Sequence, residues 1–207
     1  MNESGGLRER KKRRTRRTIA DAAMQLFMSD GFDRVTVDDV AAAADVAPKT
    51  VYNYFASKAD LVFDESDAIL ADLLSAVRDR SHGESALTAV GRFLARRQPE
   101  NRPAGPSAAF RRLIDESTSL RAARREMFTR FETALAGVLA EETGTAPNAV
   151  EPFVAAVALV SVFRARFELS PDSSAPEAVQ AELKLQARRA LALLEDGLGH
   201  YATSRQP

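Results

Sequence analysis

Apolar residues recur every three or four positions along most of the chain, which is the period of an amphipathic α-helix. The strict alternation that predicts a strand does not persist beyond a few residues. Helices are predicted over about residues 10–30, 37–44, 48–55, 57–80, 84–97, from 107 onward, 119–143, 149–169 and 176–202. The pattern therefore predicts an all-α fold of about nine helices.

The predicted helix over 149–169 is apolar on all sides from Phe153 to Phe163, with Ser161 as the one interruption. Such a helix must be covered on every side, and one chain can cover part of it. The next helix, 176–202, carries its own apolar stripe: Leu183, Ala190, Leu191, Leu194 and Leu198. We therefore expect these two helices from two chains to form a four-helix bundle, which makes the protein a homodimer.

The two shortest predicted helices lie in the stretch TVDDVAAAADVAPKTVYNYF, residues 36–55. Thr36 can cap the first helix, since its hydroxyl can accept a backbone N–H. Pro48 can open the second, where its missing N–H costs nothing. Val51 and Phe55 give the second helix an inward face, and its other faces carry Lys49, Thr50, Tyr52, Asn53 and Tyr54. One cation, several hydroxyls and an amide on a short helix suit the DNA major groove.

Positive charge gathers in one segment, although the chain of 207 residues has a formal net charge of zero. Residues 8–17, here called the basic segment, contain one acid, Glu9, and these cations: Arg8, Arg10, Lys11, Lys12, Arg13, Arg14, Arg16 and Arg17. The segment is either a solvated tail or an arm that contacts phosphates or enters the minor groove, with an affinity that depends steeply on salt. Residues 1–9, rich in glycine, serine and charge, are expected to be disordered.

The remaining composition argues against several kinds of chemistry. The chain has no cysteine, and its two histidines, His82 and His200, lie far apart. There is no catalytic motif and no phosphate-cradling glycine loop, so we expect no enzyme activity, metal or cofactor. No apolar run reaches the roughly 18 residues that span a membrane, and no apolar signal segment opens the sequence. A cytoplasmic protein without membrane contact is therefore expected.

The stretch from about Arg17 to Phe63 resembles the helix-turn-helix region of the TetR-like transcriptional regulators, through the spaced motifs AxxLFxxxGF, TVxxVAxxAxV and TVYNYFxSKxxL. The resemblance implies a DNA-binding domain over residues 1–56 and a larger helical domain over 57–207 that holds the ligand site and the dimer interface. It also implies a homodimeric repressor that a small molecule releases from a palindromic double-stranded operator. The expected DNA contacts are Arg13, Arg14, Arg16, Arg17, Thr36, Pro48, Lys49, Thr50, Tyr52, Asn53, Tyr54 and Lys58, the last through a phosphate.

The same resemblance implies a ligand pocket among the helices between residues 57 and 169. The expected lining is Phe110, Met127, Phe128, Phe131, Phe163 and Arg164. Rigid rings with an adaptable thioether suit a largely apolar ligand. Each of these side chains can instead be plain core, and Arg164 can pair with a local acid rather than with a ligand carboxylate or phosphate. The C-terminal half is similar to that of TetR-like regulators that sense acyl-CoA or related acyl ligands.

Two other functions stay open at this point. One is a small-molecule-binding module with enzymatic turnover, against which the basic segment and the missing catalytic motif both count. The other is a regulator that works without a ligand, as an activator or a nucleoid-type DNA binder. A C-terminal domain without a cavity would favour this second alternative.

Overall fold

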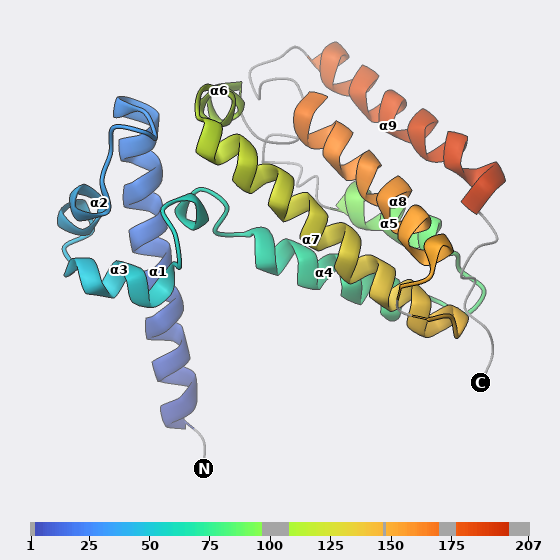
Figure 1. The fold of residues 1–207 in the computed structure, drawn as a ribbon, viewed down its shortest axis with the longest axis horizontal. Coiled ribbons are helices and arrows are strands. Elements are labelled where there is room, and N and C mark those ends of the chain that lie inside the picture. Colours follow the sequence, from blue (N-terminus) through green and yellow to red (C-terminus); the bar gives the residue numbers. More distant parts are fainter. Residues whose placement is uncertain (1–2, 97–107, 147, 170–176, 199–207) are drawn as a thin grey trace. The chain divides into compact units, whose positions relative to one another are not determined.

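A computed structural model describes residues 3–96, 108–146, 148–169 and 177–198, and every regular element in these ranges is helical (Figure 1). The described elements are α1 Glu3–Asp30, α2 Val37–Ala43, α3 Pro48–Tyr54, the short 3-10 helix η1 Ala59–Leu61, α4 Ser66–Arg78, α5 Ala86–Arg96, α6 Ala108–Glu116, α7 Thr118–Thr143, α8 Val150–Leu169 and α9 Glu177–Leu198. The all-α fold predicted from the sequence is confirmed, and most helix bounds lie within a few residues of the expected ones.

Two of the expected helix bounds were wrong. Residues 3–9 are helical rather than disordered, because α1 begins at Glu3. Glu3, Arg8 and Glu9 are favourable helix residues. With Leu7 they continue, through Gly5 and Gly6, a helix that the apolar residues downstream already nucleate. The helix expected to start at Ser57 begins instead at Ser66. Ser57 and Asp60 close a separate turn, in which each side chain accepts the other residue's backbone N–H, at 3.2 and 2.8 Å.

Several expectations fall outside the described residues. These are the connections between the helices predicted over 84–97 and from 107 onward and between those over 149–169 and 176–202, the end of the last helix beyond residue 198, and His200. The side chains of Leu183 and Leu198 on the predicted α9 stripe are likewise not described.

The chain divides into two compact units, one of residues 1–66 with 112–123 and one of residues 67–111 with 124–207. The first unit therefore extends past the expected boundary at residue 56 and takes in a second segment that the sequence did not assign to it. That residues 1–56 contact DNA, and that residues 57–207 hold the ligand site and the dimer interface, stays a prediction.

The first unit has its core where α1, α2 and α3 meet. Ile19, Phe27, Val40 and Val51 are almost fully buried there, as the apolar spacing predicted. The segment 112–123 has three buried apolar side chains of its own: Leu113, Ile114 and Leu120. It is also tied by a hydrogen bond, in which Ser117 Oγ donates to Asp33 Oδ1 at 2.9 Å.

The second unit is built around α5, α8 and α9, which pack against one another. Leu191 of α9 lies against α5, where its Cδ1 atom is 3.2 Å from the position that a Cβ would take on Gly91. The absence of a side chain at Gly91 thus lets the two helices approach closely. Leu191 is half-buried in the single chain, and its place in the dimer interface stays a prediction.

An ion pair between a buried arginine and a surface glutamate, which the sequence did not reveal, also holds this unit together. The Arg80 side chain, 2% exposed, donates from Nη1 and Nη2 to Glu142 Oε1 and Oε2, both at 2.7 Å. Its remaining donors reach the carbonyl oxygens of Val77 and Glu84. A two-bond pair with these extra acceptors satisfies a guanidinium that has lost its water.

We predict that Arg80→Met lowers the free energy of unfolding by about 2 kcal/mol, because it removes the charge-assisted hydrogen bonds of the buried guanidinium to Glu142 and its bonds to two carbonyl oxygens. The matched control is Arg78→Met, which removes an exposed pair with Glu141 at 3.7 Å and should cost less than about 1 kcal/mol. Urea unfolding of both variants measures the difference. Equal losses would show that the Arg80 pair contributes no more than a surface pair.

Candidate functional site

Local hydrogen bonds define both ends of α2, the helix that precedes α3. Thr36 Oγ1 accepts the backbone N–H of Asp39 at 3.2 Å, and Asp39 Oδ2 accepts that of Thr36 at 2.8 Å, which confirms Thr36 as the cap. The Thr36 hydroxyl also donates to Asp39 Oδ2 at 2.6 Å, and this bond, together with that from the Thr36 backbone N–H, lowers the pKa of the Asp39 carboxyl. At the other end Asp45 has φ +53°, and Val46 N–H donates to Ala41 O at 3.0 Å. This is the Schellman arrangement that ends a helix sharply.

The short helix α3 presents a polar face to solvent. Lys49, Tyr52 and Asn53, spaced at i, i+3 and i+4, are exposed, and Tyr52 is 58% exposed. Val51 on the opposite side is 1% exposed. Among the other predicted DNA contacts of this helix, Pro48 is exposed, whereas Thr50 and Tyr54 are half-buried. An exposed cation, phenol and amide on one face of a helix can meet base edges and phosphates.

Arg16 of α1 binds within the protein at the C-terminal end of α3. Its Nε donates to Asp64 Oδ1 at 2.5 Å and its Nη1 to the carbonyl oxygen of Tyr54 at 2.7 Å. The guanidinium carbon lies 4.4 Å from the centre of the Phe55 ring. A cation at this end of a helix is favoured by the unpaired carbonyls. Burial raises the pKa of Asp64, and the charge of Arg16 opposes that rise.

Lys58 also has acceptors inside the chain. Its Nζ donates to the carbonyl oxygens of Phe32 at 2.8 Å and Val35 at 3.0 Å, and lies 4.2 Å from the centre of the Phe32 ring. It therefore holds the loop between α1 and α2 in place. An ammonium has three N–H donors, so these two bonds leave one donor for the phosphate contact that stays predicted for Lys58.

The basic segment lies on the N-terminal half of α1. Arg13, Arg14 and Arg17 are exposed, as expected for phosphate contacts. Arg17 is within 3.7 Å of Asp21, and both side chains are largely exposed, so this pair contributes little. Arg16 differs from these three because its guanidinium is engaged within the fold.

The predicted ligand residues gather in the second unit. Phe131 stacks on Phe163 at a centroid distance of 5.9 Å, and Phe128 meets Phe163 edge-on at 6.0 Å. Phe167, which the sequence did not single out, joins Phe110 to Phe128 at 6.3 and 5.9 Å. Phe128, Phe131 and Met127 are buried, whereas Phe110, Phe163 and Phe167 are half-buried. The first group is core, and the half-buried rings form its accessible edge.

Arg164 meets this cluster through a local acid, the first of the two alternatives that the sequence allowed. Its Nη2 donates to Glu132 Oε1 at 2.6 Å, and its guanidinium lies over the Phe128 ring at 5.0 Å. Its Nε atom is buried and has no hydrogen-bond partner. A buried donor of this kind carries a cost unless an acceptor reaches it. Nearby on α8, burial lowers the pKa of Arg166, which donates to the carbonyl oxygen of Leu94 at 2.7 Å.

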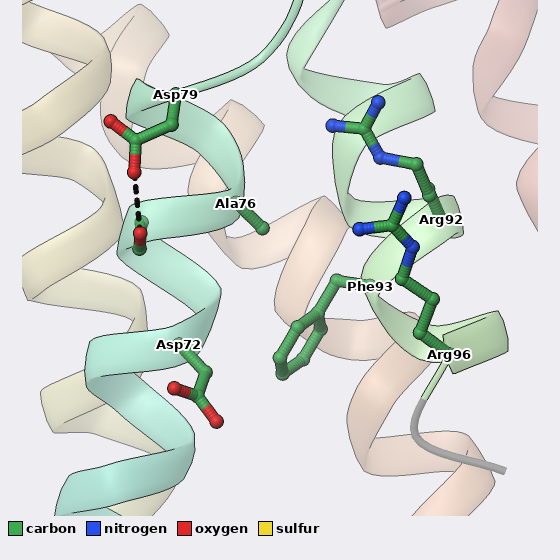
Figure 2. A pocket seen from close by; sticks show the side chains of 7 residues that line it. Asp72, Ala76, Asp79, Arg92, Phe93 and Arg96 are labelled. Atoms are coloured by element: carbon green, nitrogen blue, oxygen red, sulfur yellow. Dashed lines mark hydrogen bonds between the residues drawn. The ribbon is translucent and has the colours of Figure 1, made fainter. Parts of the chain in front are cut away.

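A pocket of about 380 Å³ lies between α4 and α5, with carboxylates on one wall and guanidiniums on the other (Figure 2). Its described lining is Asp72, Ser75, Ala76, Asp79, Arg92, Phe93 and Arg96. The polar groups include an Asp79 carboxylate that accepts from Ser75 at 2.5 Å and an Arg92 that pairs with Glu84 at 2.9 Å. None of the predicted ligand residues lines this pocket.

Within the described ranges, no cluster of three or more histidine, cysteine or acidic side chains could hold a metal ion. No helix there has the length and hydropathy needed to span a membrane.

Comparison with known proteins agrees with this geometry. Residues 19–64 match the family model of bacterial regulatory proteins of the tetR family. The HTH-type transcriptional regulator TcmR of Streptomyces glaucescens is 32% identical over 146 residues, which is 67% of this chain and 65% of TcmR, just under two thirds of that relative's length.

Two solved structures share the fold at low sequence identity. Salmonella enterica GusR has a TM-score of 0.54 and 20% identity, covering 89% of this chain and 95% of its own. NalD of Pseudomonas aeruginosa, described as the secondary repressor of the MexAB-OprM multidrug efflux pump, has a TM-score of 0.51 and 17% identity, covering 91% and 98%. Residues 19–64 therefore carry the helix-turn-helix region of the tetR family of bacterial regulatory proteins.

Proposed function

We propose that this protein is a cytoplasmic, sequence-specific DNA-binding transcriptional regulator that acts as a homodimer and leaves its operator when a small molecule binds. The observation that carries the proposal is the exposed face of α3, with Lys49, Tyr52 and Asn53 beside the basic segment of α1. The charged segment supplies affinity for the phosphates, and the α3 side chains supply contacts to base edges.

We favour repression over activation of transcription, because NalD, which shares the fold, is described as a repressor. Regulation is also favoured over enzymatic turnover, since the matched relative TcmR is named a transcriptional regulator. The DNA contacts stay as predicted, with Lys58 and Arg16 contributing chiefly through the positions they impose on α3 and its neighbouring loop.

The dimer surface that we propose is the exposed apolar face of α8 with part of α9. Phe153 and Val154 of α8 are 50% and 56% exposed, and Leu193 of α9 is 82% exposed. Large apolar side chains grouped on two helices that pack together are typical of an interface. A second copy related by two-fold symmetry presents the same surface and covers it. The two α3 helices of the dimer are then held at the spacing of two operator half-sites, about 34 Å or a multiple of it.

The effector that we propose is a largely apolar molecule, an acyl-CoA or a related acyl ligand, which sits at the half-buried edge of the phenylalanine cluster. Phe110, Phe163 and Phe167 would contact its chain. The buried Nε of Arg164 supports this placement, because a carbonyl or carboxylate of the ligand would satisfy that donor. An effector that prefers a different arrangement of these helices shifts the dimer away from the DNA-binding state.

Removing Lys49, the cation of α3, tests the proposed DNA contact. We expect Lys49→Ala to weaken binding to an operator recovered by in vitro selection by about 1–3 kcal/mol in a mobility-shift titration. Arg125→Ala, which removes one exposed charge from the second unit, is the control and should bind as the wild type does. If Lys49→Ala and Tyr54→Phe both leave binding unchanged, α3 does not face DNA as proposed.

Charges on the apolar face of α8 test the dimer. The double variant Phe153→Glu, Val154→Glu should be monomeric at micromolar concentration in sedimentation velocity, because two desolvated carboxylates oppose the interface. Its helical circular dichroism should be unchanged, since both side chains are exposed in the single chain. Thr129→Glu, Thr133→Glu on an exposed part of α7 is the control and should stay dimeric. An intact dimer from the first variant, or a monomeric wild type, would overturn this interface.

The effector site is tested by removing one donor without removing the charge. Arg164→Lys keeps a cation for Glu132 and deletes the Nε–H. We expect long-chain acyl-CoA to raise the thermal midpoint of the wild type, since a ligand at about 100 times its Kd adds about 2.7 kcal/mol. The rise should be smaller for Arg164→Lys and unchanged for Arg130→Lys, at the exposed pair with Asp67. No rise with any acyl-CoA or fatty acid would exclude the acyl class, whatever the outcome for DNA.

A further inference from the structure

The N-terminal half of α1 continues beyond the contacts that hold this helix in its unit. Arg16 is the most N-terminal residue of α1 with a described tie to another element, through Asp64 and Tyr54. From Glu3 to Thr15 the helix goes on past α3 (Figure 1). At 1.5 Å per residue this extension is about 20 Å long. Every side chain from Arg8 to Arg14 is exposed.

The charges on this extension oppose its own helical structure. Arg8 and Lys12, Arg10 and Arg14, and Arg13 and Arg17 are like-charge pairs at i, i+4, each of which destabilises a helix. Glu9 is the one acid within the basic segment, so most of this repulsion is not relieved inside the chain. A row of phosphates supplies the negative charge that would relieve it.

We propose that the basic segment binds the DNA phosphate backbone as a helix, next to the base pairs that α3 contacts, and that this contact stabilises the helix. The proposal rests on the proposed function, because it takes α3 to lie on DNA. The partner is DNA because the segment is continuous with α1 of the helix-turn-helix unit and joined through Arg16 to the end of α3.

A helical segment excludes one of the two binding modes that the sequence left open. An α-helix with its side chains is about 10–12 Å wide, and the minor groove is about 6 Å wide. The segment therefore contacts phosphates on the outside of the duplex instead of entering the minor groove. The consequence is an affinity contribution that is independent of base composition, since phosphate contacts carry no sequence information.

Thr15 allows the helix to be broken without changing any charge. Thr15→Pro removes the backbone N–H and places a ring against the preceding turn, while the helix downstream can still begin at this proline. Thr15→Ala keeps both helix and charge and is the matched control. Amide hydrogen exchange of residues 8–14 is measured for wild type and both variants, free and with a 30-base-pair duplex of mixed sequence.

The duplex should slow exchange in residues 8–14 at least tenfold for wild type and Thr15→Ala, and leave it fast for Thr15→Pro. A second measurement compares wild type with a variant lacking residues 1–14 on alternating A·T and alternating G·C duplexes. The deletion should weaken binding by the same factor on both duplexes. It should also flatten the log–log salt dependence by about 0.9 for each phosphate that the variant no longer neutralises.

Three results would overturn the proposal. Fast exchange of residues 8–14 in the wild-type complex would mean that the segment is not a bound helix. A weakening confined to the A·T duplex would indicate a minor-groove arm. Protection by anionic lipid vesicles but not by the duplex would assign the segment to a membrane. The proposed function fails separately, if neither wild type nor the deletion variant binds any duplex.

Discussion

The position of α3 depends on one guanidinium. Arg16 joins α1 to the last carbonyl of α3 and to Asp64, and it packs on the ring of Phe55. A seven-residue helix is too short to be stable alone in water, so tertiary contacts must hold it. The buried Val51 supplies the apolar part of that hold, and Arg16 supplies the directional part. Together, Val51 and Arg16 direct the polar face of α3 toward solvent.

Two other cations, Lys58 and Arg80, also hold loops and helix ends in position through hydrogen bonds inside the fold. Lys58 keeps the loop before α2 against the Phe32 ring, and Arg80 secures its helix end to Glu142. In each case a cation donates to backbone or carboxylate oxygens instead of facing solvent. Three surfaces take no part in this internal bonding: the polar face of α3, the basic segment and the apolar face of α8. The proposed contacts with DNA and with a second chain use these surfaces.

Local signals in the sequence were sufficient for much of the fold. The helical period predicted the elements, and Thr36 was confirmed as a cap because capping depends on residues three positions apart. The start of α1 was misjudged because glycine and charge suggested disorder, whereas the downstream helix extends through them. The start of α4 was misjudged because Ser57 does close a turn, but the turn belongs to a short 3-10 segment.

By itself the sequence determined the fold class, the helix-turn-helix and the clustering of positive charge in the basic segment, because each depends on neighbours along the chain. Tertiary structure alone decided which charges are used internally. Nothing near Arg16, Lys58 or Arg164 in the sequence identifies Asp64, the Phe32 carbonyl or Glu132 as their partners. The tertiary structure likewise decided that Leu191 faces Gly91. The sequence shows that α9 has an apolar stripe, but it does not show which helix packs against that stripe.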